Sequence, residues 1–165
     1  EMITKKIEDA LNLQMNREFF NARLYFAMAG YFDSLDMPGA TAWMEKQAEE
    51  ENGHAMRFYQ HIKERGGRVA ISELSAPPKE WDSPRAAFEA AYEHECRVSR
   101  EMDEHWELAE AEKDNATKVF LHWFIEEQVE EEASVDEIVK QLIKVGDEPR
   151  GLFMVDQMLS RRGES

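Results

Sequence analysis

The sequence predicts an all-α fold, an antiparallel four-helix bundle with one long crossover and a short fifth helix at the C-terminus. Proline and glycine are concentrated in a few short stretches, and these divide the chain into four long segments. Within each segment apolar residues recur at steps of three and four, which is typical of a helix that buries one face. A shorter apolar segment near the C-terminus supplies the fifth helix.

The first two helices are expected on either side of a tight turn. The first should cover residues 4–33, with Thr4 as its N-cap, and the segment Asp36-Met37-Pro38-Gly39 should end it. The second should cover residues 38–65, because Gly66-Gly67 provides the C-terminal stop.

The third and fourth helices are expected to form a second hairpin. Ser83-Pro84 combines an N-cap with proline at the first helical position, which predicts a helix over residues 84–113. The fourth helix should cover residues 115–145 and stop at Gly146. The short fifth helix is expected over residues 149–160.

Residues 66–82 join the two hairpins and show no helical period. A bundle helix of about 28 residues is roughly 40 Å long, and an extended segment of about 17 residues reaches at most about 55–60 Å. This crossover can therefore run the whole length of the bundle, whereas the short turns make the helices within each hairpin antiparallel.

Length and composition favour one globular domain over residues 1–165, with 42% hydrophobic and 33% charged residues. No apolar run of about 18 residues is present to span a membrane, and the N-terminus has no secretory-signal pattern. The formal charge of −15 disfavours nucleic acid and anionic lipid as partners and favours cations. Cys96 is the only cysteine, which excludes an internal disulfide and a cysteine-built metal site and favours a reducing cytoplasm.

Four glutamates interrupt the apolar stripes, one on each long helix and each within about one turn of the helix midpoint. Because antiparallel packing aligns the midpoints, the four side chains should converge at one level of the core. Burying an unpaired charge costs many kcal/mol, so these carboxylates must be protonated, paired with Lys or Arg, or bound to metal. No Lys or Arg lies near them on the stripes, which favours metal. The four residues are Glu18, Glu51, Glu95 and Glu131.

An ExxH motif, Glu51-Asn52-Gly53-His54, places a carboxylate and an imidazole on one helix face. Alone this motif is weak and favours a hydrogen-bonded core histidine. Beside three further inward glutamates it favours a metal site. Oxygen-rich sites with one imidazole suit iron or manganese, and zinc is less apt.

Several stretches carry a family resemblance. They are Asn16-Arg17-Glu18, Gln47-Ala48-Glu49-Glu50-Glu51 with His54, Tyr92-Glu93-His94-Glu95, and Phe120-Leu121-His122-Trp123 leading into Glu127-Gln128-Val129-Glu130-Glu131-Glu132. On these stretches the chain resembles the non-haem ferritins of bacteria and archaea, over nearly its whole length. The ferritin-like fold is the four-helix bundle with one long crossover. More symmetric di-iron proteins carry a second ExxH motif, and this chain has Gln128-Val129-Glu130-Glu131 in its place, as ferritins do.

The resemblance implies a di-iron centre that oxidises Fe(II). The first iron is expected on Glu18, Glu51 and His54, with Gln128 nearby. The second is expected on Glu51, Glu95 and Glu131, so that Glu51 bridges the pair.

The resemblance also implies a tyrosine beside the centre and a third iron site. Tyr25 lies two turns from Glu18 on the same face, where it can donate a hydrogen bond, donate an electron, or simply pack. The third site is expected on Glu50, Glu127, Glu130 and Glu131, although their spacing alone fits a solvated acidic face equally well.

Two related families fit less well. In bacterioferritins a haem-ligating methionine directly follows the glutamate of the first ExxH motif, and here that position is Asn52, so no haem is expected. Rubrerythrins need a cluster of cysteines, which Cys96 alone does not provide.

The resemblance therefore implies iron storage with ferroxidase activity in a hollow homo-oligomeric cage of twenty-four subunits. Oxygen or peroxide would be the oxidant, and Fe(III) would be deposited as a mineral. The fifth helix would help to line or close the cage. Two alternatives stay open: a di-iron oxidase that retains its cluster and acts on an organic substrate, and an acidic structural bundle without metal.

Overall fold

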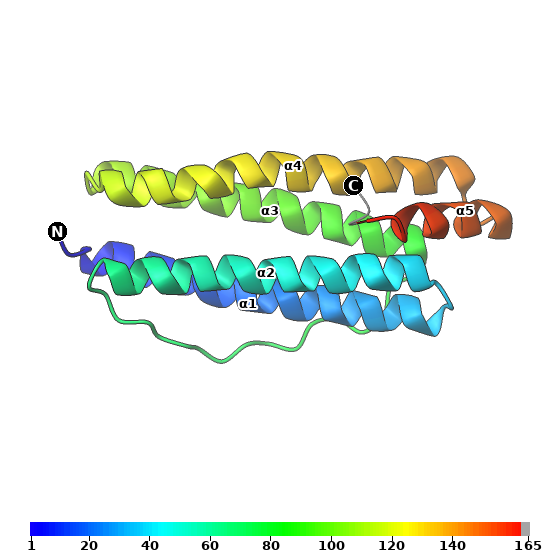
Figure 1. Ribbon diagram of the computed structural model, residues 1–165, viewed down its shortest axis with the longest axis horizontal. Coiled ribbons are helices and arrows are strands. Elements are labelled where there is room, and N and C mark those ends of the chain that lie inside the picture. The colour runs from blue at the N-terminus through cyan, green and yellow to red at the C-terminus, as the bar shows by residue number, and fades with distance from the viewer. Residues whose placement is uncertain (163–165) are drawn as a thin grey trace.

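The computed structural model describes residues 1–162 and confirms the all-α bundle. Figure 1 shows two antiparallel hairpins lying side by side, with a short helix at one end and a long crossover along the outside. None of the helices in this described part is long and apolar enough to cross a membrane. The helices are α1 (Lys5–Ser34), α2 (Pro38–Glu64), α3 (Pro84–Ala111), α4 (Asn115–Val145) and α5 (Pro149–Leu159).

The fourth helix has the predicted bounds, and the other four helices differ from theirs by one or two residues. The third helix stops at Ala111 rather than at residue 113, because Lys113 adopts a positive φ of 56° that an α-helix does not accept. α2 and α5 each end one residue earlier than predicted, and α1 ends one residue later. The Thr4 hydroxyl accepts a bond from the Ile7 N–H, and the Ser83 hydroxyl caps α3 in the same way.

The crossover between Glu64 and Pro84 is held against α1 by two asparagines one turn apart. Asn12 donates to the carbonyl of Arg68 at 2.8 Å and accepts from the N–H of Ala70 at 2.7 Å. Asn16 donates to the carbonyl of Ala70 at 2.9 Å and accepts from the N–H of Ser72 at 3.0 Å. These side chains satisfy backbone groups that the crossover, which forms neither helix nor strand, cannot satisfy itself.

The apolar core is divided into two clusters along the bundle axis. One cluster includes Ile7, Met15, Phe58 and Leu121, and the other includes Met28, Met44, Phe88 and Leu142. Between them lies a polar level to which every long helix contributes a buried glutamate. We call these four residues, Glu18, Glu51, Glu95 and Glu131, the carboxylate layer.

α5 is anchored to the start of α2. The side chain of Asp156 accepts bonds from the N–H groups of Gly39 at 3.1 Å and Ala40 at 2.7 Å. It thereby caps α2, whose own N-cap residue, Met37, makes no side-chain cap bond. A Cβ at position 39 would lie 1.9 Å from the carbonyl oxygen of Asp156, so only glycine allows this close approach.

Candidate metal centre

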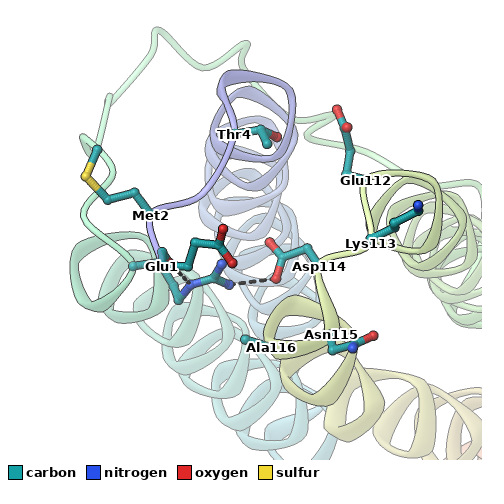
Figure 2. A pocket seen from close by; sticks show the side chains of 9 residues that line it. Glu1, Met2, Thr4, Glu112, Lys113, Asp114, Asn115 and Ala116 are labelled. Carbon is teal, nitrogen blue, oxygen red and sulfur yellow. Dashed lines mark hydrogen bonds and ion pairs between the residues drawn. The ribbon is translucent and has the colours of Figure 1, made fainter.

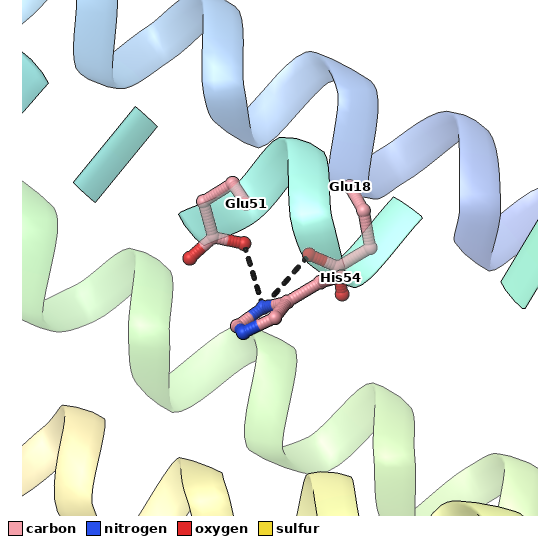
Figure 3. A group of neighbouring side chains, drawn as sticks. All are labelled: Glu18, Glu51 and His54. Carbon is pink, nitrogen blue, oxygen red and sulfur yellow. Dashed lines mark ion pairs between the residues drawn. The ribbon is translucent and has the colours of Figure 1, made fainter. Parts of the chain in front are cut away.

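Glu18, Glu51 and His54 meet at the centre of the bundle. Figure 3 shows the two carboxylates, one from α1 and one from α2, converging on Nδ1 of His54. The Nδ1 atom lies 3.3 Å from Oε2 of Glu51 and 3.9 Å from Oε2 of Glu18. All three residues are buried, and their ligand atoms lie within 4.8 Å of one another. This is a spacing at which one cation can bind all three.

Glu51 is the least satisfied member of the group. Its side chain is 1% exposed, and Oε2 has no hydrogen-bond partner within residues 1–162, although it lies near the imidazole. Burial raises the pKa of Glu51 well above its ordinary value, and the charges of Glu95 and Glu131 raise it further. An unpaired buried oxygen of this kind calls for a cation or a proton.

Glu18 is held by two amides from its own helix. Gln14 donates to Oε1 at 3.1 Å, and Asn21 donates to Oε2 at 3.2 Å. Gln14 also bonds His105 at 2.9 Å through its amide oxygen, which leaves its nitrogen facing the carboxylate. Burial and the charge of Glu51 still raise the pKa of Glu18 well above its ordinary value.

Glu95 is bonded from two other helices. The hydroxyl of Tyr25 donates to Oε1, and the amide of Gln128 donates to Oε2 at 3.0 Å. Burial raises the pKa of Glu95 to about 7, and these two donors oppose that rise. The nitrogen of Gln128 is thus engaged, so only its carbonyl oxygen remains as a ligand atom.

Glu131 completes the layer from α4. Gln47 donates to its Oε2 at 2.6 Å. Burial raises the pKa of Glu131 to about 7, and the charge of Glu95 contributes to this rise. Glu131 also forms a second close group with His54 and the half-buried Glu127, again within 4.8 Å.

The expected ligand sets are therefore gathered unevenly. The first set, Glu18, Glu51 and His54, is assembled. The oxygens of the second set, Glu51, Glu95 and Glu131, do not form a close group. Glu95 and Glu131 instead each accept a hydrogen bond from a neutral donor. Like charges at one level repel one another, so each of these two carboxylates accepts a hydrogen bond from a nearby N–H or O–H group.

The residues expected for the third site are only partly gathered. Glu127 and Glu131 share a group, joined by His54. Glu50 is half-buried and pairs with Arg162 at 3.1 Å. Glu130 is exposed and belongs to neither close group.

The wall around His54 is aromatic. Its ring packs edge-on against Trp123 and Phe124, with centroid distances of 5.5 and 5.8 Å. The guanidinium of Arg57 covers the Trp123 ring from 3.6 Å. These contacts fix the imidazole and keep one side of the site apolar.

The remaining four histidines lie outside the two close groups of ligand atoms. His61 stacks on Phe120 and bonds the Thr117 hydroxyl at 3.2 Å, and His122 is exposed. His94 and His105 are both buried, and burial lowers the pKa of each to about 4, so both are neutral near pH 7.

A surface pocket of about 440 Å³ lies at the end of the bundle, away from the carboxylate layer. Figure 2 shows it between the N-terminus and the α3–α4 turn. Its arginine, Arg65, bonds Asp114 at 2.8 Å and the carbonyl of Glu1 at 3.2 Å. Because Arg65 and Asp114 already pair with each other here, the buried layer is the stronger candidate site.

Sequence reasoning named Tyr25 and Gln128, which hold Glu95, but missed the other residues that hold the carboxylates. Gln14 and Asn21 flank Glu18 at helical spacing, and a polar residue at such a position on a buried face was a usable signal. Gln47 lies on the inner face of α2, yet its bond to Glu131 depends on how two distant helices pack. Arg162 lies beyond any helical pattern, so no signal in the sequence pointed to it.

The fold and the site together define a class: a bundle of two helical hairpins around a buried layer of carboxylates with one imidazole. The ferritin-like domain family matches residues 8–145. The bacterial non-heme ferritin of Bacteroides fragilis (strain 638R) is 39% identical over 161 residues, which cover 98% of this chain and 100% of that one. The corresponding ferritin of Staphylococcus aureus (strain MRSA252) is 36% identical, covering 98% and 97%.

A solved structure agrees with these relatives. The open pore ferritin from the hyperthermophilic archaeon Archaeoglobus fulgidus is 48% identical, with a TM-score of 0.96, and the match covers 97% of this chain and 99% of that one. The chain belongs to the ferritin family, as its sequence motifs had indicated.

Proposed function

We propose that this protein stores iron and has ferroxidase activity, oxidising Fe(II) to Fe(III) at an intra-subunit two-iron site. The observation that carries the proposal is Glu51, whose buried Oε2 has no partner within residues 1–162 and lies beside a second carboxylate and an imidazole. Two further buried carboxylates lie at the same level. Membership of the ferritin family supports iron as the cation and storage as its purpose.

The donor set suits iron. Carboxylates are hard anionic donors that stabilise Fe(III) over Fe(II), and one imidazole adds a borderline donor. Glu18, Glu51 and His54 would bind one Fe(II), and Glu51, Glu95 and Glu131 the other, with Glu51 shared. Gln128 would supply at most its carbonyl oxygen, since its nitrogen is bonded to Glu95.

Two irons held about 3.5–4 Å apart can act on one oxidant together. Two Fe(II) lose two electrons, which with two protons convert O₂ to hydrogen peroxide, or convert peroxide to two water molecules. Glu95 and Glu131 have pKa values near 7 and would release protons as the cations bind. Tyr25 holds Glu95 from the other side and would fix its orientation.

A third cation site is proposed on Glu50, Glu127, Glu130 and Glu131. The close approach of Glu127 and Glu131 to His54 supports it. Such a site would take Fe(III) leaving the pair on its way to the mineral. Its most exposed member, Glu130, would join only when a cation is present.

Assembly into a cytoplasmic homo-oligomeric cage, with twenty-four subunits, is part of the same proposal. Exposed apolar side chains on α5 and elsewhere support it, because a chain in solution rarely leaves several on one short helix. On α5 these are Phe153, Met154 and Met158. The negative charge of −15 would attract iron and repel nucleic acid, and no haem is expected to bind.

The test is a count of iron. The purified protein is given excess Fe(II) in air and gel-filtered, and iron per chain is measured. Glu51→Gln serves as the site variant, and Glu49→Gln, an exposed neighbour on α2, serves as the matched control. We expect wild type and Glu49→Gln to carry far more than three irons per chain in a large particle, and Glu51→Gln to oxidise Fe(II) at least about 100-fold more slowly.

Other counts would change the conclusion. Two or three irons per chain would favour the oxidase that retains its cluster. No bound iron in wild type would leave only the structural bundle.

A further inference from the structure

Beyond α5 the chain continues away from the end of the bundle, and the structure describes it as far as Arg162 (Figure 1). This arginine makes three bonds to one face of α2. It donates to the carbonyl of Trp43 at 2.9 Å, to Oε1 of Gln47 at 2.8 Å and to Oε2 of Glu50 at 3.1 Å. Its guanidinium also lies 4.4 Å from the centre of the Trp43 ring. Such a set of contacts fixes a long side chain well beyond a simple surface ion pair.

Arg162 reaches the carboxylate layer through Gln47. An arginine only donates, so the Gln47 oxygen must face Arg162 and its nitrogen must face Glu131, which it bonds at 2.6 Å. The positive charge therefore lies one amide away from a buried carboxylate. Glu50, the other partner of Arg162, is close enough to Glu51 and Glu131 for its charge to act on both.

We propose that Arg162 is an internal counter-cation at the third metal site, occupying Glu50 until an incoming cation displaces it. This inference rests on the proposed function, because it needs Glu50 to bind a metal cation. A guanidinium and a metal cation cannot share Oε2 of Glu50, so the two compete. The buried two-iron site, whose expected ligands Arg162 does not contact, fills first, and Glu50 becomes available only when the Arg162 side chain moves away.

The strength of the Arg162–Glu50 ion pair sets how strongly Arg162 competes with a metal cation for Glu50. The ion pair between Arg162 and Glu50 is partly exposed, with 23% of the Arg162 side chain and 35% of the Glu50 side chain accessible. An exposed ion pair contributes up to about 1 kcal/mol, which corresponds to about a fivefold change in a dissociation constant. Because Arg162 also bonds Trp43 and Gln47, removing it should tighten binding of the third cation by at least about fivefold.

The test uses zinc as a redox-inert probe on the full-length, metal-free protein. Isothermal titration calorimetry resolves the stepwise dissociation constants for wild type, Arg162→Ala, Arg162→Lys, Glu50→Gln and the double variant Arg162→Ala/Glu50→Gln. Arg161→Ala is the matched control, since it removes the same charge from an exposed neighbour. Anomalous scattering from zinc-soaked crystals shows which step fills the position at Glu50.

We expect Arg162→Ala to tighten only the third step, Arg162→Lys to tighten it less, and Arg161→Ala to leave it unchanged. In the Glu50→Gln background, loss of Arg162 should have no effect on zinc binding. Equal third steps in wild type and Arg162→Ala would overturn the role of Arg162, and so would an effect that persists without Glu50. Absence of zinc from the buried two-metal site in wild type would overturn the proposed function together with this inference.

Discussion

The hydroxyl of Tyr25 on α1 donates a hydrogen bond to Glu95 on α3, so a side chain of one hairpin holds a carboxylate of the other. Both side chains are fully buried, and the Gln128 amide holds the second oxygen of Glu95 from α4. The carboxylate layer is therefore joined by directed bonds across three helices as well as by its depth in the core.

Replacing Tyr25 by phenylalanine should separate this bond from packing. Tyr25→Phe keeps the ring but removes the donor, which should lower the free energy of unfolding by only about 1 kcal/mol. Because the bond favours ionised Glu95, its loss should raise the pKa of Glu95 and weaken zinc binding severalfold at pH 7. Calorimetry checks the affinity, and Tyr31→Phe, on the same helix but in the apolar cluster, is the control. Unchanged zinc affinity would mean that Tyr25 only packs.

Cation binding should depend steeply on pH near neutrality. Burial raises the pKa values of Glu95 and Glu131 to about 7, and a bound cation needs both carboxylates ionised. Below pH 7 protons compete, so affinity should fall by up to about tenfold per pH unit for each proton displaced, and it should level off above pH 8. Titration in two buffers of different ionisation enthalpy counts the released protons. A flat profile from pH 6 to pH 8 would contradict the assignment of these groups.

The carboxylate layer should cost the metal-free protein stability at high pH. Glu131 has a folded pKa of about 7 against an ordinary value of 4.5, so between these values the folded state holds the extra proton. The contribution of Glu131 to the free energy of unfolding is therefore fully present below about pH 4.5 and is lost as the pH rises through 7. Glu131→Gln should accordingly stabilise the metal-free protein by up to about 3 kcal/mol at pH 8 and hardly at all at pH 4.5.

Urea unfolding with a chelator present, at one protein concentration, measures this difference. Glu130→Gln, an exposed neighbour, is the control and should show no such dependence. Equal stabilisation by Glu131→Gln at both pH values would show that burial of the charge is not the cause.

The docking of α5 should depend on Asp156 and Gly39. Asp156→Asn keeps the size but loses the negative charge at the start of α2, which should cost about 1 kcal/mol. Gly39→Ala brings a Cβ against the carbonyl of Asp156 and should cost more, about 2–3 kcal/mol. Thermal unfolding and protease cleavage within residues 149–162 measure both effects. Gly53→Ala, where an added Cβ meets nothing within 4 Å, should be harmless.

The inward position of the carboxylates was predictable because the helical period is local. The steps of three and four place Glu18, Glu51, Glu95 and Glu131 on the buried faces, and the structure finds all four buried. Their common depth followed from the short turns within each hairpin and from the length of the crossover. The pairing of Glu51 with His54 followed from their spacing on one helix.

What each carboxylate contacts was decided by the tertiary structure. Glu95 turns to Tyr25, and Glu131 to Gln47, because like charges at one level repel and the nearest donors come from other helices. Arg162 meets Gln47 across more than a hundred residues of chain, and the segment that carries it has no periodic pattern to reveal its direction.

The sequence by itself thus determined the helices, their buried faces and the level at which the charges meet, since these depend on spacing along one helix. The donors that hold the charges, and the arginine that neutralises Glu50, depend on rotations and approaches between helices. Those are set by the packing of two apolar clusters, to which the whole chain contributes and which no single segment encodes.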